Sequence, residues 1–338
     1  MRAEISAVLT LLLLLASCAP APEPLAISGQ AMGTTYTLRF GRLPPGLDRD
    51  RLQADVAAEL AAVEAAMSTW RPDSEISRFN RSRSTDWQPA SPALVQVVDR
   101  ALTIAELSGG ALDITAGPLV AAWGFGPGDG RDRPPTVDEI VAARARVDYR
   151  MLKSRAEPPA LRKLRPDLEL DLSAIAKGHA VDRLAALLEA RGISDYLVEI
   201  GGELRTGGRR PDGRAWRIGV EKPDRLGRSV QRVLSMQVNA AVATSGDYRN
   251  FFTSGERRFG HIIDPRSGQA VANGLASVTV LADNCTDADG LATALFVLGP
   301  DAGFDLASRQ GLAVLFVLRD DGEYRERATP ALTRWLAD

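Results

Sequence analysis

The sequence predicts an α+β protein, in which a mixed and largely antiparallel sheet packs against helices in one large folded unit. Helical and strand-like segments follow one another without the regular alternation of a doubly wound sheet, and no strand-like segment leads into a glycine-rich dinucleotide fingerprint. The 338 residues are 45% hydrophobic and 25% charged, which is typical of a globular protein with a substantial core. No linker after residue 28 separates independent domains.

The N-terminal residues are expected to export and anchor the chain. A short apolar run precedes the stretch "LASC", which ends at Cys18 and resembles the bacterial lipobox, whose cysteine is acylated. We therefore expect a lipoprotein signal peptide over 1–17, a lipidated Cys18 with a proline-rich tether over 18–28, and the folded unit over 29–338. This anchor would hold the protein on a bacterial membrane, inner or outer, facing the periplasm. The alternative is a secreted protein cleaved near Ala16.

The charge and the cysteine content argue against a nucleic-acid-binding protein and against a disulfide-stabilised one. The formal net charge is −2 and no basic run of five or more residues occurs, so the sequence gives no electrostatic match to a nucleic-acid backbone. The chain has two cysteines, and lipidation of Cys18 leaves Cys285 without a partner, so we expect no disulfide framework. Cys285 has no basic sequence neighbour to lower its pKa, and we expect it to be a small buried residue.

In the first half of the chain, hydrophobic spacing predicts a strand followed by helices. Tyr36, Leu38 and Phe40 alternate with polar residues, which indicates a strand over 30–40. Apolar residues recur at helical spacing over 50–67. A second helix begins after the N-cap Ser91 with Pro92 in its first turn, and it ends before Gly109; an exposed loop over 126–135 and a short helix over 136–147 follow.

From residue 168 onward, short strands dominate. They are expected at 168–170, 195–200, 216–221, 232–238, 260–264 and 275–281, with helices at 174–190 and 288–298 between them. A helix at 301–309, a strand at 311–318 and a short C-terminal helix complete the chain. The pair Gly201 and Gly202, with Glu199 and Glu203 on either side, indicates strands joined by a tight turn.

A helix that begins near residue 174 carries Lys177 and Gly178 in its first turns. A helix N-terminus with free backbone N–H groups, small side chains and a lysine is a favourable place for a phosphate group. The spacing does not match the Walker pattern. An ordinary capped helix with a solvated lysine remains the alternative.

Two histidines occur in the chain, His179 and His261. His261 lies in a strand-like segment that runs into an Asp-Pro turn, where a neutral imidazole can act as a general base near neutral pH. The alternative is a structural histidine.

The segment "CTDADGLATALFVLG" places Asp289 and Thr293 one helical turn apart on the same face. A carboxylate and a hydroxyl are oxygen ligands suited to Mg²⁺, which often takes few protein ligands and completes its shell with water and substrate phosphate. The alternative is that Asp289 caps the helix and Thr293 bonds the preceding turn.

Together these segments resemble the ApbE family, the FAD:protein FMN transferases, over nearly the whole chain that follows the tether. The matching blocks occur in the family's order: "AMGTTYT", "MSTWRPDSEISRFN", "GGALDITAGPLVAAWGFGP", "DLSAIAKGHAVDRLAALLEARGI", "YLVEIGGEL", "ATSGDYRNFF", "HIIDPRSG" and "DADGLATALFVLG". The resemblance implies an ApbE-like fold and a Mg²⁺-dependent enzyme that transfers the FMN half of FAD to a threonine hydroxyl of a target protein, such as a subunit of a membrane redox pump, and releases AMP.

The resemblance also implies the roles of particular residues. Asp289, Thr293 and the backbone carbonyl of Ala174 would bind Mg²⁺, while a further acidic ligand of some relatives is replaced here by Ala292. His261 matches the proposed base, and His179 stands where relatives often have tyrosine. The contacts to FAD would be Met32, Trp70, Ala111, Leu112, Asp113, Asp171, Lys177 and Ile263. Trp70 offers a flat apolar face for the isoalloxazine ring.

Two other functions fit the same residues. An FAD pyrophosphatase would use water in place of threonine and release FMN and AMP. A periplasmic flavin-binding lipoprotein would carry out no chemistry, although a passive binder needs neither a metal site nor a base.

Overall fold

The computed structural model describes residues 24–336, apart from 129, 132, 224–228, 237, 238, 249, 256, 321 and 322. Within these residues the main element is an eight-stranded sheet in the order β1-β2-β6-β7-β10-β13-β14-β15, and all of its neighbouring strands pair in antiparallel fashion. Its strands are β1 (Leu25–Ala31), β2 (Thr34–Phe40), β6 (Tyr196–Ile200), β7 (Glu203–Gly207), β10 (Ala240–Gly246), β13 (Leu275–Ala282), β14 (Ala313–Asp320) and β15 (Glu323–Ala328). The predicted α+β class is confirmed.

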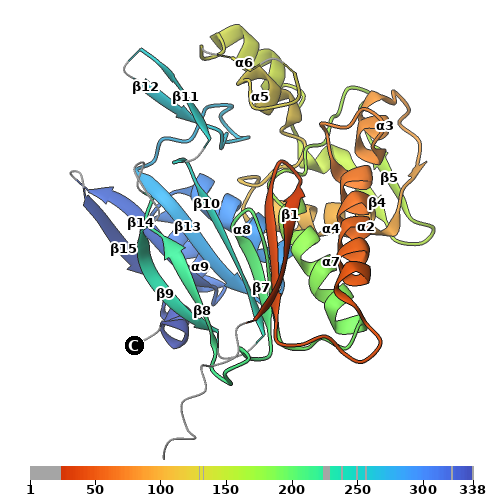
Figure 1. Cartoon of the computed structure of the whole chain (residues 1–338). Helices are drawn as coiled ribbons and strands as arrows, with labels where there is room; N and C mark the ends of the chain where they lie inside the picture. Colours follow the sequence, from red (N-terminus) through yellow and green to blue (C-terminus); the bar gives the residue numbers. More distant parts are fainter. Residues whose placement is uncertain are drawn as a thin grey trace, which may run out of the picture.

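The sheet has a hydrophobic core on each face, because successive strand residues point to opposite sides. In β10, Ala241 and Ala243 belong to one core, whereas Ala240 and Val242 belong to the other. The first core is covered by helices: α8 packs on β10 and β13, and α7 packs on α8, with α2 and α4 beside them (Figure 1). These helices are α2 (Arg49–Met67), α4 (Pro92–Leu107), α7 (Ala176–Ala190), α8 (Cys285–Leu298) and α9 (Ala302–Arg309).

The second face is covered by a hairpin and the C-terminal turn. Strands β8 (Trp216–Glu221) and β9 (Val230–Met236) supply Trp216 and Met236 to the second core, and the 3-10 helix η3 (Pro330–Trp335) adds Trp335. Both faces of the central strands β7, β10, β13 and β14 are therefore largely buried, and this packing holds the ends of β7 and β10 that line the site.

Two smaller units adjoin the sheet. A three-stranded sheet in the order β3-β5-β4 lies with α3 and α4, and the β11–β12 hairpin lies with α5 and α6 beyond one end of the large sheet (Figure 1). Their bounds are α3 (Glu75–Arg81), β3 (Gln88–Pro89), α5 (Gly117–Ala122), α6 (Val137–Arg144), η2 (Tyr149–Met151), β4 (Leu152–Arg155), β5 (Ala160–Lys163), β11 (Phe251–Ser254) and β12 (Arg257–Gly260).

The structure confirms the predicted helices and corrects several strands. The segment 30–40 is two strands joined by a turn at Met32 and Gly33, and β1 begins at Leu25, so the folded unit begins before residue 29. Residues 168–170 form no strand. The segment 260–264 is not a strand either, because β12 ends at Gly260 and Ile263 makes only an isolated bridge to Ala270.

The signal peptide, Cys18 and most of the tether lie outside the described residues. Within the part that the structure describes, no helix has the length and apolar character needed to cross a bilayer. Cys285 is fully buried as predicted, and burial raises the pKa of its thiol.

Candidate active site

A cavity of about 400 Å³ opens between α7, α8, the ends of β7 and β10, and the segment that precedes α5. This volume lies within the range of small-molecule sites. The cavity brings together residues from both halves of the chain, and most of the predicted site residues line it: Ala111, Leu112, Asp113, Asp171, Ala174, Lys177, His261, Ile263, Asp289 and Thr293.

Met32 and Trp70 do not line this cavity. Met32 has a φ of 52°, an uncommon conformation for a residue other than glycine. Its N–H donates to Glu64 Oε1 at 2.6 Å, and Glu64 Oε2 lies 3.9 Å from the guanidinium of Arg71, beside Trp70. Trp70 is 65% exposed, so its indole is available to a ligand at the surface.

Helices α7 and α8 approach each other at Gly178. A Cβ atom there would lie 2.2 Å from the carbonyl oxygen of Cys285, so only glycine allows this contact. The approach brings the Gly178 N–H within 2.9 Å of Asp289 Oδ2, to which it donates a hydrogen bond. Asp289 is 3% exposed and lies in the second turn of a helix capped by Asn284, so it is not the N-cap.

Lys177 lies between two buried carboxylates. Its Nζ is 3.0 Å from Glu203 Oε1 and 3.7 Å from Asp289 Oδ1. Burial lowers the pKa of Lys177, but Asp289 and Glu203 outweigh that effect and keep the pKa above its ordinary value. Burial raises the pKa of Asp289, against the opposing effect of Lys177. The cluster formally carries two negative charges and one positive charge, which favours a further cation.

Glu203 is a site residue that the sequence reasoning assigned to scaffolding. It begins β7 directly after the Gly201-Gly202 turn, where both glycines have positive φ, and it is 4% exposed on the cavity wall. Its Oε2 atom is buried and has no hydrogen-bond partner among the described residues.

Replacing Lys177 with methionine is expected to lower the free energy of unfolding at pH 8 by about 3 kcal/mol, because it leaves Asp289 and Glu203 buried without their counter-ion. Urea denaturation measures this. The Lys177→Met/Asp289→Asn double variant, which removes one of the two carboxylates, should recover part of the loss. If both variants were equally unstable, the lysine would not be compensating the carboxylates.

His261 follows β12 and lies on the cavity wall. Its Nδ1 is 3.1 Å from the carbonyl oxygen of Asn250, and because a carbonyl only accepts, Nδ1 is the donor and Nε2 is left free in the neutral ring. Burial lowers the pKa of His261, with a smaller opposing effect of the Asn250 hydrogen bond. The ring is therefore neutral near pH 7 and can accept a proton.

Aromatic and ionic contacts fix the hairpin that carries His261. The ring of Phe125 meets His261 edge-on at 6.2 Å between centroids, and Trp123 lies 5.4 Å from Phe259. On the other side, Asp247 pairs with Arg319 of β14 and, at 3.2 Å, with Arg258 of β12. The hairpin is thus tied to both α5 and the large sheet.

Three residues with oxygen atoms suited to a metal ion line the cavity: Ala174, Asp289 and Thr293. No group of three or more His, Cys, Asp or Glu side chains capable of holding a metal occurs within the described residues. Thr293 Oγ1 lies 3.0 Å from Ser245 Oγ. A buried carboxylate with few neighbouring ligands fits Mg²⁺ better than metals that require nitrogen or sulfur.

The other predicted contacts have structural partners as well. The carboxylate of Asp113 accepts hydrogen bonds from Thr115 and from the N–H of Tyr149, so it organises its own loop. Asp171 Oδ1 accepts from the N–H of Ser173 at 2.8 Å. Tyr248 and Asn250 line the cavity too.

His179 follows Gly178 in α7 and is 4% exposed. Burial lowers its pKa from 6.5 to about 4, and its Nε2 atom has no hydrogen-bond partner among the described residues. A depressed native pKa means that the unfolded state binds more protons between pH 4 and 6.5, so stability from this group is lost as the pH falls through that window.

His179→Leu is expected to make the protein less sensitive to acid. From pH 7.5 to pH 5 the wild type should lose about 2 kcal/mol more unfolding free energy than the variant, because the variant has no imidazole to protonate. Urea denaturation at the two pH values measures the difference. Equal losses in the two proteins would show that His179 titrates normally.

The chain is similar to named proteins over nearly its whole length. A Vibrio cholerae protein named FAD:protein FMN transferase is 43% identical over 326 residues, which cover 96% of this chain and 97% of that protein. A Haemophilus influenzae protein of the same name is 38% identical, with 95% and 94% covered.

Solved structures agree as well. The flavin transferase ApbE from Vibrio cholerae has a TM-score of 0.85 and 41% identity, with 93% of this chain and 99% of that chain covered. The apo form of Pseudomonas stutzeri flavinyl transferase ApbE has a TM-score of 0.84 and 38% identity, with 93% and 97% covered.

The fold and the cavity thus define an enzyme of the transferase class. The sequence model of the ApbE family matches residues 32–316, and the chain belongs to the ApbE family.

Proposed function

We propose that this protein transfers the FMN half of FAD to a threonine hydroxyl of a target protein and releases AMP. The observation that carries the proposal is the joint presence in one cavity of a buried lysine–carboxylate cluster and a neutral imidazole. The lysine suits a pyrophosphate and the imidazole suits a hydroxyl nucleophile. The names of the relatives, flavin transferase and FAD:protein FMN transferase, support it.

Asp289, Thr293 and the carbonyl of Ala174 would hold Mg²⁺ in this proposal. The ion would supply neutralisation of charge on the pyrophosphate oxygens. Lys177, in the first turn of α7 and paired with Glu203 and Asp289, would also bind the pyrophosphate. Asp289 and Glu203 share one lysine, so the cluster has excess negative charge, and a bound cation would offset that charge next to an anionic substrate.

The chemical step requires one proton transfer and one exchange of bonds at phosphorus. The free Nε2 of His261 accepts the proton of the threonine hydroxyl, and the oxygen bonds to the phosphorus of the FMN half. The bond from that phosphorus to the bridging oxygen breaks, and AMP leaves with the electron pair. Because phosphoryl transfer depends on positioning and electrostatics, the rigid wall formed by α7 and α8 is a suitable support.

The flavin would extend from the phosphate region to the surface. Ala111, Leu112 and Ile263 offer apolar contacts on the cavity wall, and the exposed indole of Trp70 together with the Met32 turn would bind the isoalloxazine ring. In the cell, a lipid anchor at Cys18 would hold this site on the periplasmic side of a membrane, near membrane-bound target proteins.

Product analysis distinguishes the proposal from its rivals. The protein is incubated with FAD and Mg²⁺, with and without an acceptor that has an exposed threonine segment, and AMP and free FMN are separated by chromatography. Transfer gives AMP that depends on the acceptor, without an equal amount of free FMN. Equal amounts of AMP and FMN in both reactions indicate a pyrophosphatase, and unchanged FAD indicates a binding protein; either result contradicts the proposal.

A further inference from the structure

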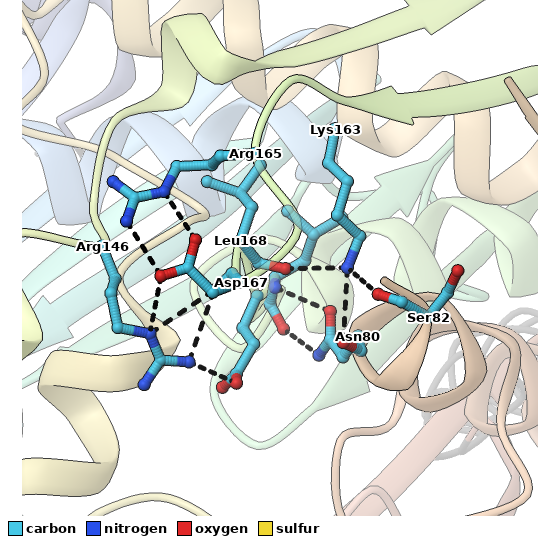
Figure 2. Close-up of polar contacts among 9 residues, drawn as sticks. Asn80, Ser82, Arg146, Lys163, Arg165, Asp167 and Leu168 are labelled. Carbon is cyan, nitrogen blue, oxygen red and sulfur yellow. Dashed lines mark hydrogen bonds and ion pairs between the residues drawn. The ribbon is translucent and has the colours of Figure 1, made fainter. Parts of the chain in front are cut away.

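The segment from Leu164 to Leu170 leads from β5 directly into the cavity wall. After the hydrogen bond from the Leu164 N–H to the Met151 carbonyl, no strand of the described residues pairs with it. Sequence patterning predicts a strand at 168–170, and the structure has irregular backbone there instead. The segment ends at Asp171 and is followed by Ala174, both of which line the cavity. Side chains from other elements hold this segment, as Figure 2 shows.

Asn80, at the end of α3, takes the place of a neighbouring strand. Its Nδ2 donates to the carbonyl oxygen of Leu170 at 2.9 Å, and its Oδ1 accepts from the N–H of the same residue at 2.8 Å. Two bonds to one residue reproduce the hydrogen-bonded pair of an antiparallel ladder. Asn80 therefore fixes both the position and the orientation of the peptide units next to Asp171.

Lys163 holds the same segment from its buried side. Its side chain is 0% exposed, and its Nζ donates to the carbonyl oxygens of Leu168 at 3.0 Å, Ser82 at 2.9 Å and Asn80 at 3.3 Å (Figure 2). The ammonium also lies 4.8 Å from the centre of the Phe79 ring. Burial lowers the pKa of Lys163 to about 8. One ammonium thus joins the end of α3 to the segment that leads into the site.

On its outer side the segment is held by ion pairs that are partly open to solvent. Arg165 makes a two-bond ion pair with Asp167 at 2.7 and 2.8 Å, and Arg146 reaches Asp167 and Glu169 (Figure 2). The side chains of Arg165 and Asp167 are each 34% exposed. Exposed ion pairs contribute little to stability, so these contacts provide an internal comparison for the buried ones.

The N-terminal end of α3 connects to the loop that carries Trp70. The helix is capped by Ser74, which is fully buried, and the loop before it carries Trp70. Asn80 and Lys163 therefore join the loop of Trp70 to the segment of Asp171 through one short helix.

We propose that Asn80 and Lys163 are positioning residues that set the place of Asp171 and the Ala174 carbonyl relative to the rest of the cavity. Neither side chain lines the cavity. They act through the backbone of Leu168 and Leu170, whose carbonyl oxygens and Leu170 N–H they bind, whereas the N–H of Asp171 donates to the carbonyl oxygen of Ile114 at 2.8 Å. This inference rests on the proposed function, since it assigns to these residues an effect on flavin binding and transfer.

The test uses Asn80→Asp in the full chain, with Arg165→Gln as the matched control on the outer side of the same segment. The aspartate keeps the size of the side chain but places an oxygen against the Leu170 carbonyl. We expect amide hydrogen exchange over 168–175 to become about tenfold faster in Asn80→Asp and to stay unchanged in the control. FAD affinity, read from flavin fluorescence, and turnover at saturating FAD should each fall about tenfold.

Several outcomes decide between the possibilities. Faster local exchange with unchanged FAD affinity and turnover would overturn the inference, because the contacts of Asn80 and Lys163 would then have only a structural role. Equal changes in Arg165→Gln would overturn it as well. If the wild type binds FAD but transfers no FMN, only the proposed transfer is overturned. The positioning role is then still tested, because hydrogen exchange and FAD affinity can be compared between the wild type and the variants. If Asn80→Asp does not fold, Asn80→Ala, which removes both bonds without adding a charge, takes its place with the same expected results.

Discussion

Asp289→Asn is expected to reduce the rate of FAD turnover by at least about a thousandfold at millimolar Mg²⁺. The substitution keeps the side chain's shape but removes the buried carboxylate charge from the cavity wall, which in the proposed site is the strongest protein ligand for Mg²⁺. The rate is measured as AMP release, and the binding of Mg²⁺ is measured separately by calorimetry, where the variant should give no heat in the range in which the wild type saturates.

The fold of this variant should be retained, because Lys177 keeps Glu203 as a partner at 3.0 Å. A matched control is Asp287→Asn on the same helix, since Asp287 pairs with Arg100 and does not line the cavity. The control should keep its turnover and its Mg²⁺ binding. Undiminished turnover in Asp289→Asn would remove Asp289 from the metal site.

His261→Gln is expected to lower the rate of transfer by about a hundredfold to a thousandfold while FAD affinity changes by less than about threefold. The amide of glutamine can bond to the Asn250 carbonyl but cannot accept a proton. In the wild type, the lowered pKa of His261 keeps the ring neutral as the pH falls below 6.5, so transfer should decline only at more acid pH. This decline should be absent from the residual activity of the variant.

Transfer rates measured between pH 5 and pH 8 at saturating FAD check this expectation, alongside FAD titrations of both proteins. His179→Leu is the control, because it removes the other imidazole and leaves the cavity wall intact. A loss of FAD affinity as large as the loss of transfer would assign His261 to binding instead of proton transfer.

Local signals explain why the helices were predicted well. Ser91 accepts a hydrogen bond from the N–H of Leu94, and Thr136 forms a capping box with Glu139. The starts of these helices therefore depend on residues that are adjacent in the sequence. The strand predicted at 168–170 failed because its pairing partner is the side chain of Asn80, 90 residues away. No pattern within the segment itself reports such a partner.

The family resemblance and the helical spacing predicted most of the residues that line the cavity. Asp289 and Thr293 line the same cavity, as their spacing of one turn predicts, and Lys177 faces them from the first turn of α7. Glu203 was missed because the glycine turn before it explains the local sequence without a functional role. Its burial follows from the packing of β7 against α7 and α8, which is a property of the whole fold.

The most direct test of the central claim is the mass of an acceptor protein after incubation with this enzyme, FAD and Mg²⁺. The proposed function predicts that the intact acceptor gains the mass of one FMN moiety, that fragmentation places it on a single threonine, and that an acceptor with valine at that position gains nothing. An acceptor of unchanged mass, in a reaction where FAD is nevertheless split to FMN and AMP, would contradict the claim.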